Sequence, residues 1–309
     1  MNAHAMYKHI LVPLDGSELA EVVFPYAGEI AVGLKLEQLT LLRVIPPEEK
    51  NLVALHKGYI ERAAETVGSL CRDVQPIKRA GVCAEKVQSR GVLAIGHPAE
   101  EILRYAEDND VDLILMATHG RTGVQRWTMG SIADKVLRAS KVPVWLVRAG
   151  LPQEIVHDYL PIRRILVPLD GSELAESVLP HAEAVAKQSD PGSIEIVLLA
   201  VCDPTLPATY YAPAAPVNWD EQVKGWKRKD EQYLAKIEKR LRDSGLNVRS
   251  EVLIGKPAET IVEYASENRV SLIVMSTHGR SGLGRWVFGS VAEKVLHGVT
   301  TPILLVRPH

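Results

Sequence analysis

The stretch ILVPLDGSELAE (residues 10–21) recurs letter for letter at residues 165–176 of the 309-residue chain. A second pair of blocks, AIGHPAEEILRYA (94–106) and LIGKPAETIVEYA (253–265), is also closely matched. A chain of this length is long enough for about two domains. We therefore interpret the repetition as a duplicated domain and expect both copies to adopt one fold.

The spacing of the repeated blocks predicts the domain boundaries. The first blocks lie 155 residues apart and the later blocks 159 residues apart, so the second copy carries four additional residues. The proline-rich stretch 203–222 is where we expect this insertion. We assign residues 1–148 to the first domain, 149–161 to a linker and 162–309 to the second domain.

Each copy alternates between two hydrophobic patterns. Short runs rich in β-branched residues are followed by longer stretches with apolar residues three and four apart, which is typical of βα repeats. The runs LILMA (113–117) and LIVMS (272–276) lack polar alternation, as strands buried on both faces of a parallel sheet do. In the first copy we expect strands near 10–14, 38–44, 74–80, 113–117 and 142–147, a further candidate strand at 92–95, and helices near 18–32, 52–70, 100–107 and 131–140. The predicted fold class is α/β, with two Rossmann-like open parallel sheets in a pseudo-twofold tandem repeat.

Composition narrows the class of protein. The chain is 46% hydrophobic and 24% charged, which is ordinary for a soluble globular protein. Its net charge of −2 gives no basic field, so we expect neither nucleic acid nor a membrane as a partner. The three cysteines form no CxxC pair and are too few for a disulfide framework, and no signal or membrane segment is evident. We expect a cytoplasmic protein.

The loop after the first predicted strand has two compatible interpretations. It reads PLDGS at residues 13–17 and again at 168–172. In the structural interpretation the aspartate forms an Asx-turn, the glycine adopts a left-handed conformation and the serine caps the next helix. In the functional interpretation the carboxylates of Asp15 and Asp170 accept hydrogen bonds from a nucleoside, because ligands of open sheets bind beyond the strands' carboxyl ends.

The loop after the fourth predicted strand is glycine-rich in both copies. THG is followed by nine residues and then by Gly-Ser, which opens a helix, at 118–131 and at 277–290. Glycines let a backbone approach an anion closely, and a helix N-terminus adds N–H donors for phosphate. The pattern predicts a phosphate cradle that is neither a P-loop nor a GxGxxG loop.

Arginines in this loop could supply positive charge. The alternative is a solvated surface in which they stack on the neighbouring tryptophans. The residues concerned are Arg121 and Arg126 beside Trp127 in the first copy, and Arg280 and Arg285 beside Trp286 in the second.

Two other residue types in these loops have structural alternatives. Ser131 and Ser290 begin S-x-x-D/E patterns that resemble capping boxes, so each serine could cap its own helix. His119 and His278 lack partners at metal-ligand spacing, and we expect packing or a backbone hydrogen bond rather than catalysis. No hydrolase triad signature, CxxC zinc pair or HExxH motif is present, so we assign no catalytic or metal-binding residue.

Taken together, these motifs resemble the universal stress protein family. The resemblance rests on Pro-x-Asp-Gly-Ser, the G-x-P-x-x-x-I turn, the THG loop with Gly-Ser nine residues later, and the final strands KVPVWLVR and TPILLVR. Each copy is similar to one complete domain with an adenine nucleotide alpha hydrolase-like fold. ATP-binding members carry G-x-x-G, nine residues, then G-S or G-T, whereas Ala117 and Ser276 replace the first glycine here.

The resemblance implies a site for ATP, with or without Mg²⁺, in each copy. The implied binding residues are Pro13, Asp15, Val44, Met116, Ala117, His119, Gly120, Arg121, Gly130, Ser131 and Ile132 in the first copy, and Pro168, Asp170, Val201, Met275, Ser276, His278, Gly279, Arg280, Gly289, Ser290 and Val291 in the second. The family also pairs domains through the last strand, so we expect residues 142–147 and 303–306 to pair within the chain as a pseudo-dimer. A further homodimer of two chains is compatible with this pairing.

Three functions are compatible with this pattern. The first is an ATP-binding stress-response regulator that acts through nucleotide-dependent conformation. The second is a slow ATPase or phosphoryl-transfer enzyme, which requires Mg²⁺ and a water-positioning residue. The third is a nucleotide-free interaction scaffold, which the replacement of the first motif glycine favours.

Overall fold

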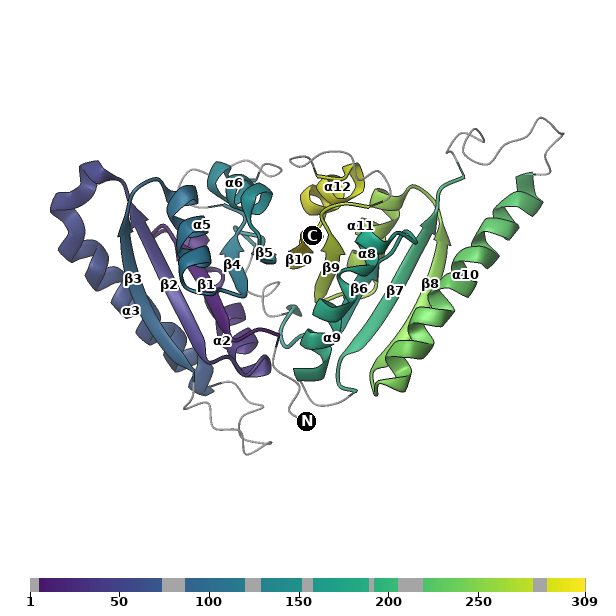
Figure 1. Ribbon diagram of the computed structural model, residues 1–309, viewed down its shortest axis with the longest axis horizontal. Coiled ribbons are helices and arrows are strands. Elements are labelled where there is room, and N and C mark those ends of the chain that lie inside the picture. The colour runs from purple at the N-terminus through teal and green to yellow at the C-terminus, as the bar shows by residue number, and fades with distance from the viewer. Residues whose placement is uncertain are drawn as a thin grey trace.

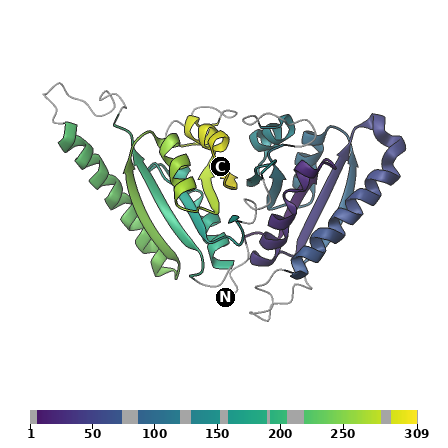
Figure 2. The same cartoon turned by 180° about the vertical axis from the view of Figure 1, so that it is seen from behind.

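The protein consists of two similar halves that lie side by side. The structure, a computed structural model, describes residues 6–73, 87–119, 129–151, 158–188, 192–204, 219–279 and 288–308. Figures 1 and 2 show the halves from the front and from behind, with α3 and α10 at the two outer ends and α6 and α12 adjacent at the centre.

Strands and helices alternate along each half. The first half comprises β1 (His9–Leu14), α1 (Glu18–Glu21), α2 (Phe24–Gly33), β2 (Gln38–Ile45), η1 (Pro47–Leu52), α3 (Val53–Asp73), β3 (Gln88–Ile95), α5 (Pro98–Asp108), β4 (Leu113–Ala117), α6 (Ser131–Ala139) and β5 (Val144–Val147). The second comprises β6 (Arg164–Pro168), α8 (Glu173–Glu176), α9 (Leu179–Gln188), β7 (Glu195–Cys202), α10 (Trp219–Asp243), β8 (Asn247–Ile254), α11 (Pro257–Glu267), β9 (Leu272–Ser276), α12 (Ser290–Gly298) and β10 (Ile303–Val306).

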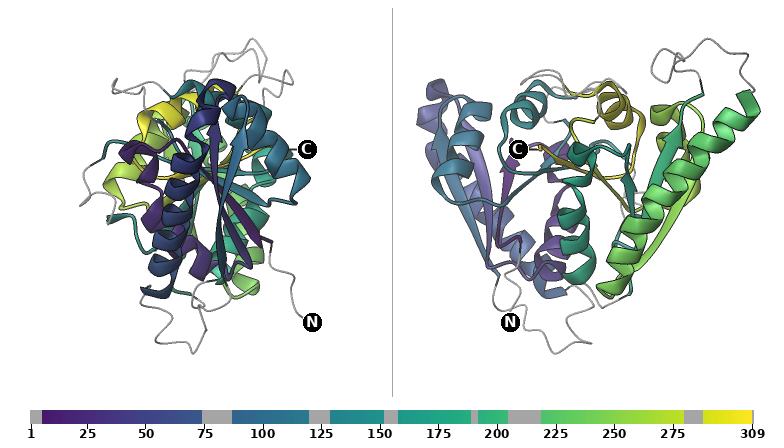
Figure 3. Two further views of the ribbon diagram at one scale, coloured as in Figure 1. Left: turned by 90° about the vertical axis from the view of Figure 1, so that its left-hand side faces the viewer. Right: turned by 45° about the vertical axis from the view of Figure 1, so that its right-hand side comes forward.

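The ten strands of the described residues form one sheet in the order β3-β2-β1-β4-β5-β10-β9-β6-β7-β8. All neighbours are parallel except β5 and β10, which pair antiparallel with Leu304 opposite Trp145. This contact confirms the expected pairing of the final strands, and it joins the two predicted sheets into one (Figure 3). Pairing removes both strand edges from solvent.

Both faces of the sheet are buried under helices. On β2, Leu39 and Leu41 belong to one hydrophobic cluster, whereas Leu42 and Val44 belong to the other. Because successive side chains of a strand point to opposite faces, a strand covered on both sides is apolar throughout. The Rossmann-like α/β fold predicted from these runs is confirmed.

Two predicted elements differ in the structure. The helix expected at 18–32 is broken into α1 and α2, since Pro25 in the first turn of α2 has no N–H to continue the preceding turn. The third strand is Gln88–Ile95, which confirms the candidate strand at 92–95. The strand expected at 74–80 and most of the insertion expected at 203–222 lie outside the described residues.

Candidate functional site

Each half contains a cavity at the carboxyl ends of its strands. The order β3-β2-β1-β4-β5 reverses direction between β1 and β4, and ligands of open α/β sheets bind at such a switch point. The first cavity, of about 280 Å³, is lined by the ends of β1, β2 and β4 and by the start of α6. The second, of about 310 Å³, lies at the equivalent place in the second half. We name them the first and second clefts.

The PLDGS loop forms one side of each cleft. Oδ1 of Asp15 accepts hydrogen bonds from the Ser17 backbone N–H (3.0 Å) and the Ser17 hydroxyl (2.6 Å). Ser17 in turn caps α1 by accepting from the N–H of Ala20 (3.2 Å), and Gly16 has φ of 76°. The second half repeats this arrangement at 170–175. The predicted Asx-turn and cap are therefore confirmed, and they hold each aspartate at the lining of its cleft.

The opposite side of the first cleft is the N-terminus of α6. Its N-cap is Gly130, no side chain caps it, and Gly130 donates its own N–H to the carbonyl of Thr118 (2.8 Å). The suggested capping box is wrong, because Ser131 is the first helical residue and Asp134 pairs with Arg138 instead (2.8 Å). The N–H groups of the first turn have no acceptor within the helix and lie at the cleft.

The second cleft has the same helix start at α12. Gly289 is the N-cap, no side chain caps the helix, and the glycine N–H donates to the carbonyl of Thr277 (2.8 Å). Ser290 is therefore also the first helical residue rather than a cap. Both clefts offer an uncapped helix N-terminus, which favours an anion.

Close backbone approach explains a glycine of the THG loop. A Cβ at Gly279 would stand 2.4 Å from Oδ2 of Asp170, so a larger residue would displace that carboxylate. A Cβ at Gly130 would stand 3.1 Å from the carbonyl oxygen of Thr118. The THG loop and the carboxylate of Asp170 are therefore packed against each other at the second cleft.

The residues that replace the first motif glycine cause no backbone strain. Ala117 and Ser276 end strands β4 and β9, and neither is among the residues with positive φ. The hydroxyl of Ser276 accepts a hydrogen bond from the backbone N–H of His278 (3.2 Å). A glycine is not required at this position in the described conformation.

Each cleft histidine is held by the threonine that precedes it. His119 Nδ1 lies 3.1 Å from the hydroxyl of Thr118, which also accepts the N–H of Ala149 (3.2 Å). Nε2 of His119 is a buried atom with no hydrogen-bond partner among the described residues. Burial and the nearby Arg148 lower the pKa of His119. His278 contacts Thr277 in the same way (2.9 Å).

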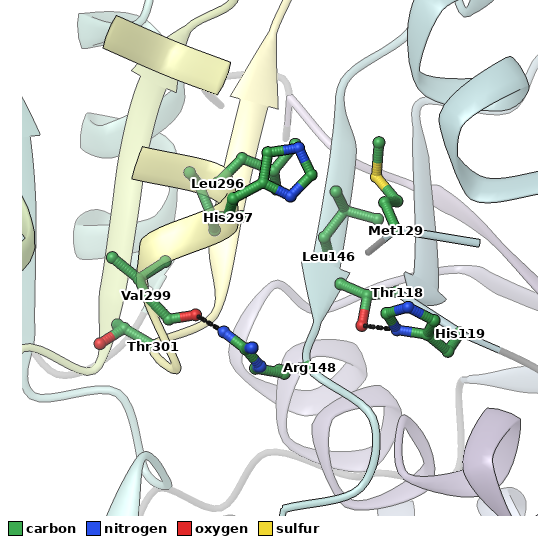
Figure 4. Close-up of a pocket in the computed structure, with 10 residues that line it drawn as sticks. Thr118, His119, Met129, Leu146, Arg148, Leu296, His297, Val299 and Thr301 are labelled. Atoms are coloured by element: carbon green, nitrogen blue, oxygen red, sulfur yellow. Dashed lines mark hydrogen bonds between the residues drawn. The ribbon is translucent and has the colours of Figure 1, made fainter. Parts of the chain in front are cut away.

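The junction between the halves lies beside the first cleft. Figure 4 shows a small cavity of about 30 Å³ with Thr118, His119 and Met129 on one side and residues 296–301 on the other. Arg148 crosses the junction and donates to the carbonyl of Val299 (2.7 Å). Thr118 and His119 line both this cavity and the first cleft, so these two residues separate the cleft from the junction.

The structure brings together most of the residues implied by the resemblance. The lining of the first cleft includes Pro13, Asp15, Val44, Met116, Ala117, His119, Gly130, Ser131 and Ile132. The lining of the second includes Pro168, Asp170, Val201, Met275, Ser276, His278, Gly279, Gly289, Ser290 and Val291. Gly120, Arg121 and Arg280, together with Arg126 and Arg285, lie outside the described residues.

Sequence reasoning missed lining residues on β2, on η1 and on α10. Arg43 and Glu49 line the first cleft, and Trp226, Lys229 and Tyr233 line the second. Arg43 could have been noticed in the sequence, because it is a charged residue within the otherwise apolar run LLRVI (41–45). The helix residues had no such signal, because their contact with the cleft depends on how α10 packs.

The described residues contain no cluster of three or more potential metal ligands, and none of their helices is long and apolar enough to cross a membrane. These two findings concern only the ranges given above.

Comparisons with known proteins agree with the duplicated architecture. A sequence model of the universal stress protein family matches residues 6–148 and again residues 161–307. Universal stress protein MJ0531 of Methanocaldococcus jannaschii is 32% identical over 145 residues, which are 47% of this chain and 82% of that protein. Universal stress protein Slr1230 of Synechocystis sp. is 23% identical over 317 residues, covering 97% of this chain and 100% of that protein.

The fold also matches a solved structure over both halves. A universal stress protein from Archaeoglobus fulgidus superposes with a TM-score of 0.63 at 22% identity, covering 98% of this chain and 99% of that chain. At this level of identity the match shows a shared fold.

Proposed function

Because the chain belongs to the universal stress protein family, we propose that it is a cytoplasmic ATP-binding regulator of the stress response rather than an efficient catalyst. One observation carries the proposal: each half places a carboxylate, Asp15 or Asp170, opposite an uncapped helix N-terminus across a single cavity. An adenine nucleotide presents hydroxyl and amino donors at one end and phosphates at the other, which matches this arrangement. Domains at 1–148 and 162–309, with a linker at 149–161, are part of the proposal.

The fit to phosphate is supported by the position of Asp134. A carboxylate in the first turn of α6 would compete with a bound phosphate, but this one pairs with Arg138 (2.8 Å). The N–H groups of Ser131 and Ile132 are then the nearest donors for phosphate oxygens. When bound, Mg²⁺ would neutralise phosphate charge. We assign it no protein ligand, since no metal-ligand cluster occurs among the described residues.

Regulation would proceed through the loops at the cleft. Phosphates held at α6 and α12 would bias the first turns of these helices, and Met129, which precedes the N-cap of α6, lies at the junction of the halves (Figure 4). Occupancy could therefore be communicated between halves through His119, which lines both cavities.

The test is to identify and count bound nucleotide. The chain is purified without added nucleotide and denatured, the supernatant is analysed by mass spectrometry, and ATP binding is then measured by calorimetry. We expect release or binding of ATP, and at least tenfold weaker binding by Asp15→Ala/Asp170→Ala, because a hydrogen bond to a charged group contributes about 1.5–3 kcal/mol.

The matched control is Ser17→Ala/Ser172→Ala, which disturbs the same turns but keeps both carboxylates, and it should still bind. No binding at millimolar ATP would overturn the proposal and favour a nucleotide-free scaffold. ADP that accumulates with time would instead identify a slow ATPase.

A further inference from the structure

The second cleft extends towards its outer helix, and the first does not. Trp226, Lys229, Asp230 and Tyr233 of α10 line the second cleft. Among the described residues, no residue of α3 lines the first cleft. The two copies of the site therefore differ in shape although their PLDGS loops are identical.

Helices α3 and α10 occupy equivalent places, so their sequences can be compared position by position. The hydroxyl of Tyr59 donates to Glu21 (2.8 Å), and the hydroxyl of Tyr233 donates to the corresponding Glu176 (3.0 Å). Counting back three residues from each tyrosine makes His56 the counterpart of Asp230.

One cause of the difference in shape between the clefts is Arg43. Arg43 pairs in register with Leu14 on β1, and the matching position beside Leu169, the residue that follows β6, is Ala200. Arg43 is 4% exposed, and its Nη1 lies 3.5 Å from the carbonyl oxygen of Leu14. Its positive charge also partly opposes the rise that burial causes in the pKa of Tyr59, so the guanidinium lies near that ring. The long side chain thus fills the space between β2 and α3.

A second contact closes the same side of the first cleft. His56 Nε2 lies 3.0 Å from the carboxylate of Glu49 in η1. In the second half the counterpart Asp230 accepts a hydrogen bond from the thiol of Cys202 on β7 (3.0 Å). This contact keeps the carboxylate against the strand and leaves the compartment next to Ala200 open.

The open compartment suits a flat ring. It begins at Asp170, the residue proposed to face the adenosine, and runs past Ala200 to the partly exposed side chains of Trp226 and Tyr233. Aromatic side chains bind planar ligand rings by stacking. The exposed Lys229 lies at the same wall.

We propose that the second cleft, and not the first, takes an adenine nucleotide that carries a second planar ring, with the ring between β7 and α10. Arg43 and the His56–Glu49 pair restrict the first cleft to unextended nucleotides. The inference rests on the proposed function, because it requires that an adenine nucleotide binds in the clefts.

The test counts binding sites for ATP and for two extended nucleotides. One probe carries the ring on the ribose, as 2′/3′-O-(N-methylanthraniloyl)-ATP, and the other carries it on the base, as N6-benzyl-ATP. Calorimetry should give two ATP molecules per chain and one molecule of at least one extended probe. Energy transfer from tryptophan to the methylanthraniloyl group would report its location, and it should decrease in Trp226→Phe, which removes one of the five tryptophans but keeps an aromatic wall.

Variants that open the first cleft and fill the second test which residues cause the difference between them. Arg43→Ala/His56→Ala should raise the count of the extended probe from one to two. Ala200→Met fills the second compartment without burying a charge, and it should reduce that count to zero. ATP should still bind in the unaltered cleft of each variant, which also reports that the variant is folded.

The outcomes separate this inference from the proposed function. If the unmodified chain binds no ATP, both fail. If ATP binds but the extended probes bind twice or not at all, or if Ala200→Met leaves their binding unchanged, only this inference is overturned.

Discussion

The hydroxyl of Tyr7 and Nδ1 of His181 lie 2.6 Å apart and form a hydrogen bond that joins the start of the first half to α9 of the second. Burial raises the pKa of the Tyr7 hydroxyl and lowers the pKa of His181 to about 4. The phenol therefore keeps its proton and the imidazole stays neutral. The bond links residues 174 positions apart, and it stabilises the docking of the halves.

Tyr7→Phe should lower the free energy of unfolding by about 1–2 kcal/mol, because it leaves a partly buried imidazole nitrogen without its hydrogen-bond partner. Urea unfolding at pH 7.5 measures the change. Tyr159→Phe is the matched control, since it removes an exposed bond of 2.7 Å between the linker and Thr300 of the second half. The control should cost less than about 0.5 kcal/mol. Equal losses in both variants would contradict the role assigned to the Tyr7 bond.

Stability should decrease as the pH falls from about 6.5 towards 4. The pKa of His181 is about 4 in the folded state against an ordinary 6.5, so the unfolded chain takes up the proton first in this window. The contribution of His181 is fully present above pH 6.5 and is lost as the pH approaches 4. Because the side chain is partly exposed, we expect a loss of about 2 kcal/mol.

The measurement is urea unfolding at pH 7 and at pH 4.5, compared with His181→Gln. The variant should lose less stability across this interval than the unmodified chain. His9 and His119, whose pKa values burial also lowers, remain in both proteins and add the same trend. A variant with an unchanged pH profile would show that His181 is not the titrating group.

Gly279→Ala should weaken nucleotide binding in the second cleft alone. The added Cβ would stand 2.4 Å from Oδ2 of Asp170 and would push that carboxylate from its place. We expect calorimetry to detect one tight site per chain instead of two, with the second site weakened about tenfold. Gly33→Ala is the control, because a Cβ there has nothing within 4 Å. Loss of both sites would indicate a general folding defect instead.

Trp145 should contribute more than other single side chains to the stability of the junction between the halves. It lies on β5 opposite Leu304 and is 1% exposed. Trp145→Ala removes a large buried side chain and should cost about 3–5 kcal/mol in chemical denaturation. Trp145→Phe should cost clearly less, since the indole Nε1 has no hydrogen-bond partner among the described residues and its removal leaves no polar group unpaired. Similar costs for both variants would contradict this account.

Local patterns in the sequence predicted the parts of the fold that depend on near neighbours in the chain. The PLDGS loop formed the expected Asx-turn and cap because its contacts span only three residues. The buried strand Leu113–Ala117 followed from its unbroken apolar run. By contrast, the proline break before α2 was missed and the suggested cap at Ser131 was wrong, although the helix itself starts at the predicted residue 131.

The duplication itself, the Rossmann-like fold of each half and the pairing of the final strands were determined by the sequence, since repeated blocks and exposed strand edges leave few alternatives. Only the tertiary structure decided that the two clefts differ. Arg43 and Ala200 occupy matching strand positions, but what each does to its cleft depends on helices α3 and α10 that pack across it. Such contacts join residues far apart in the chain, and no local pattern encodes them.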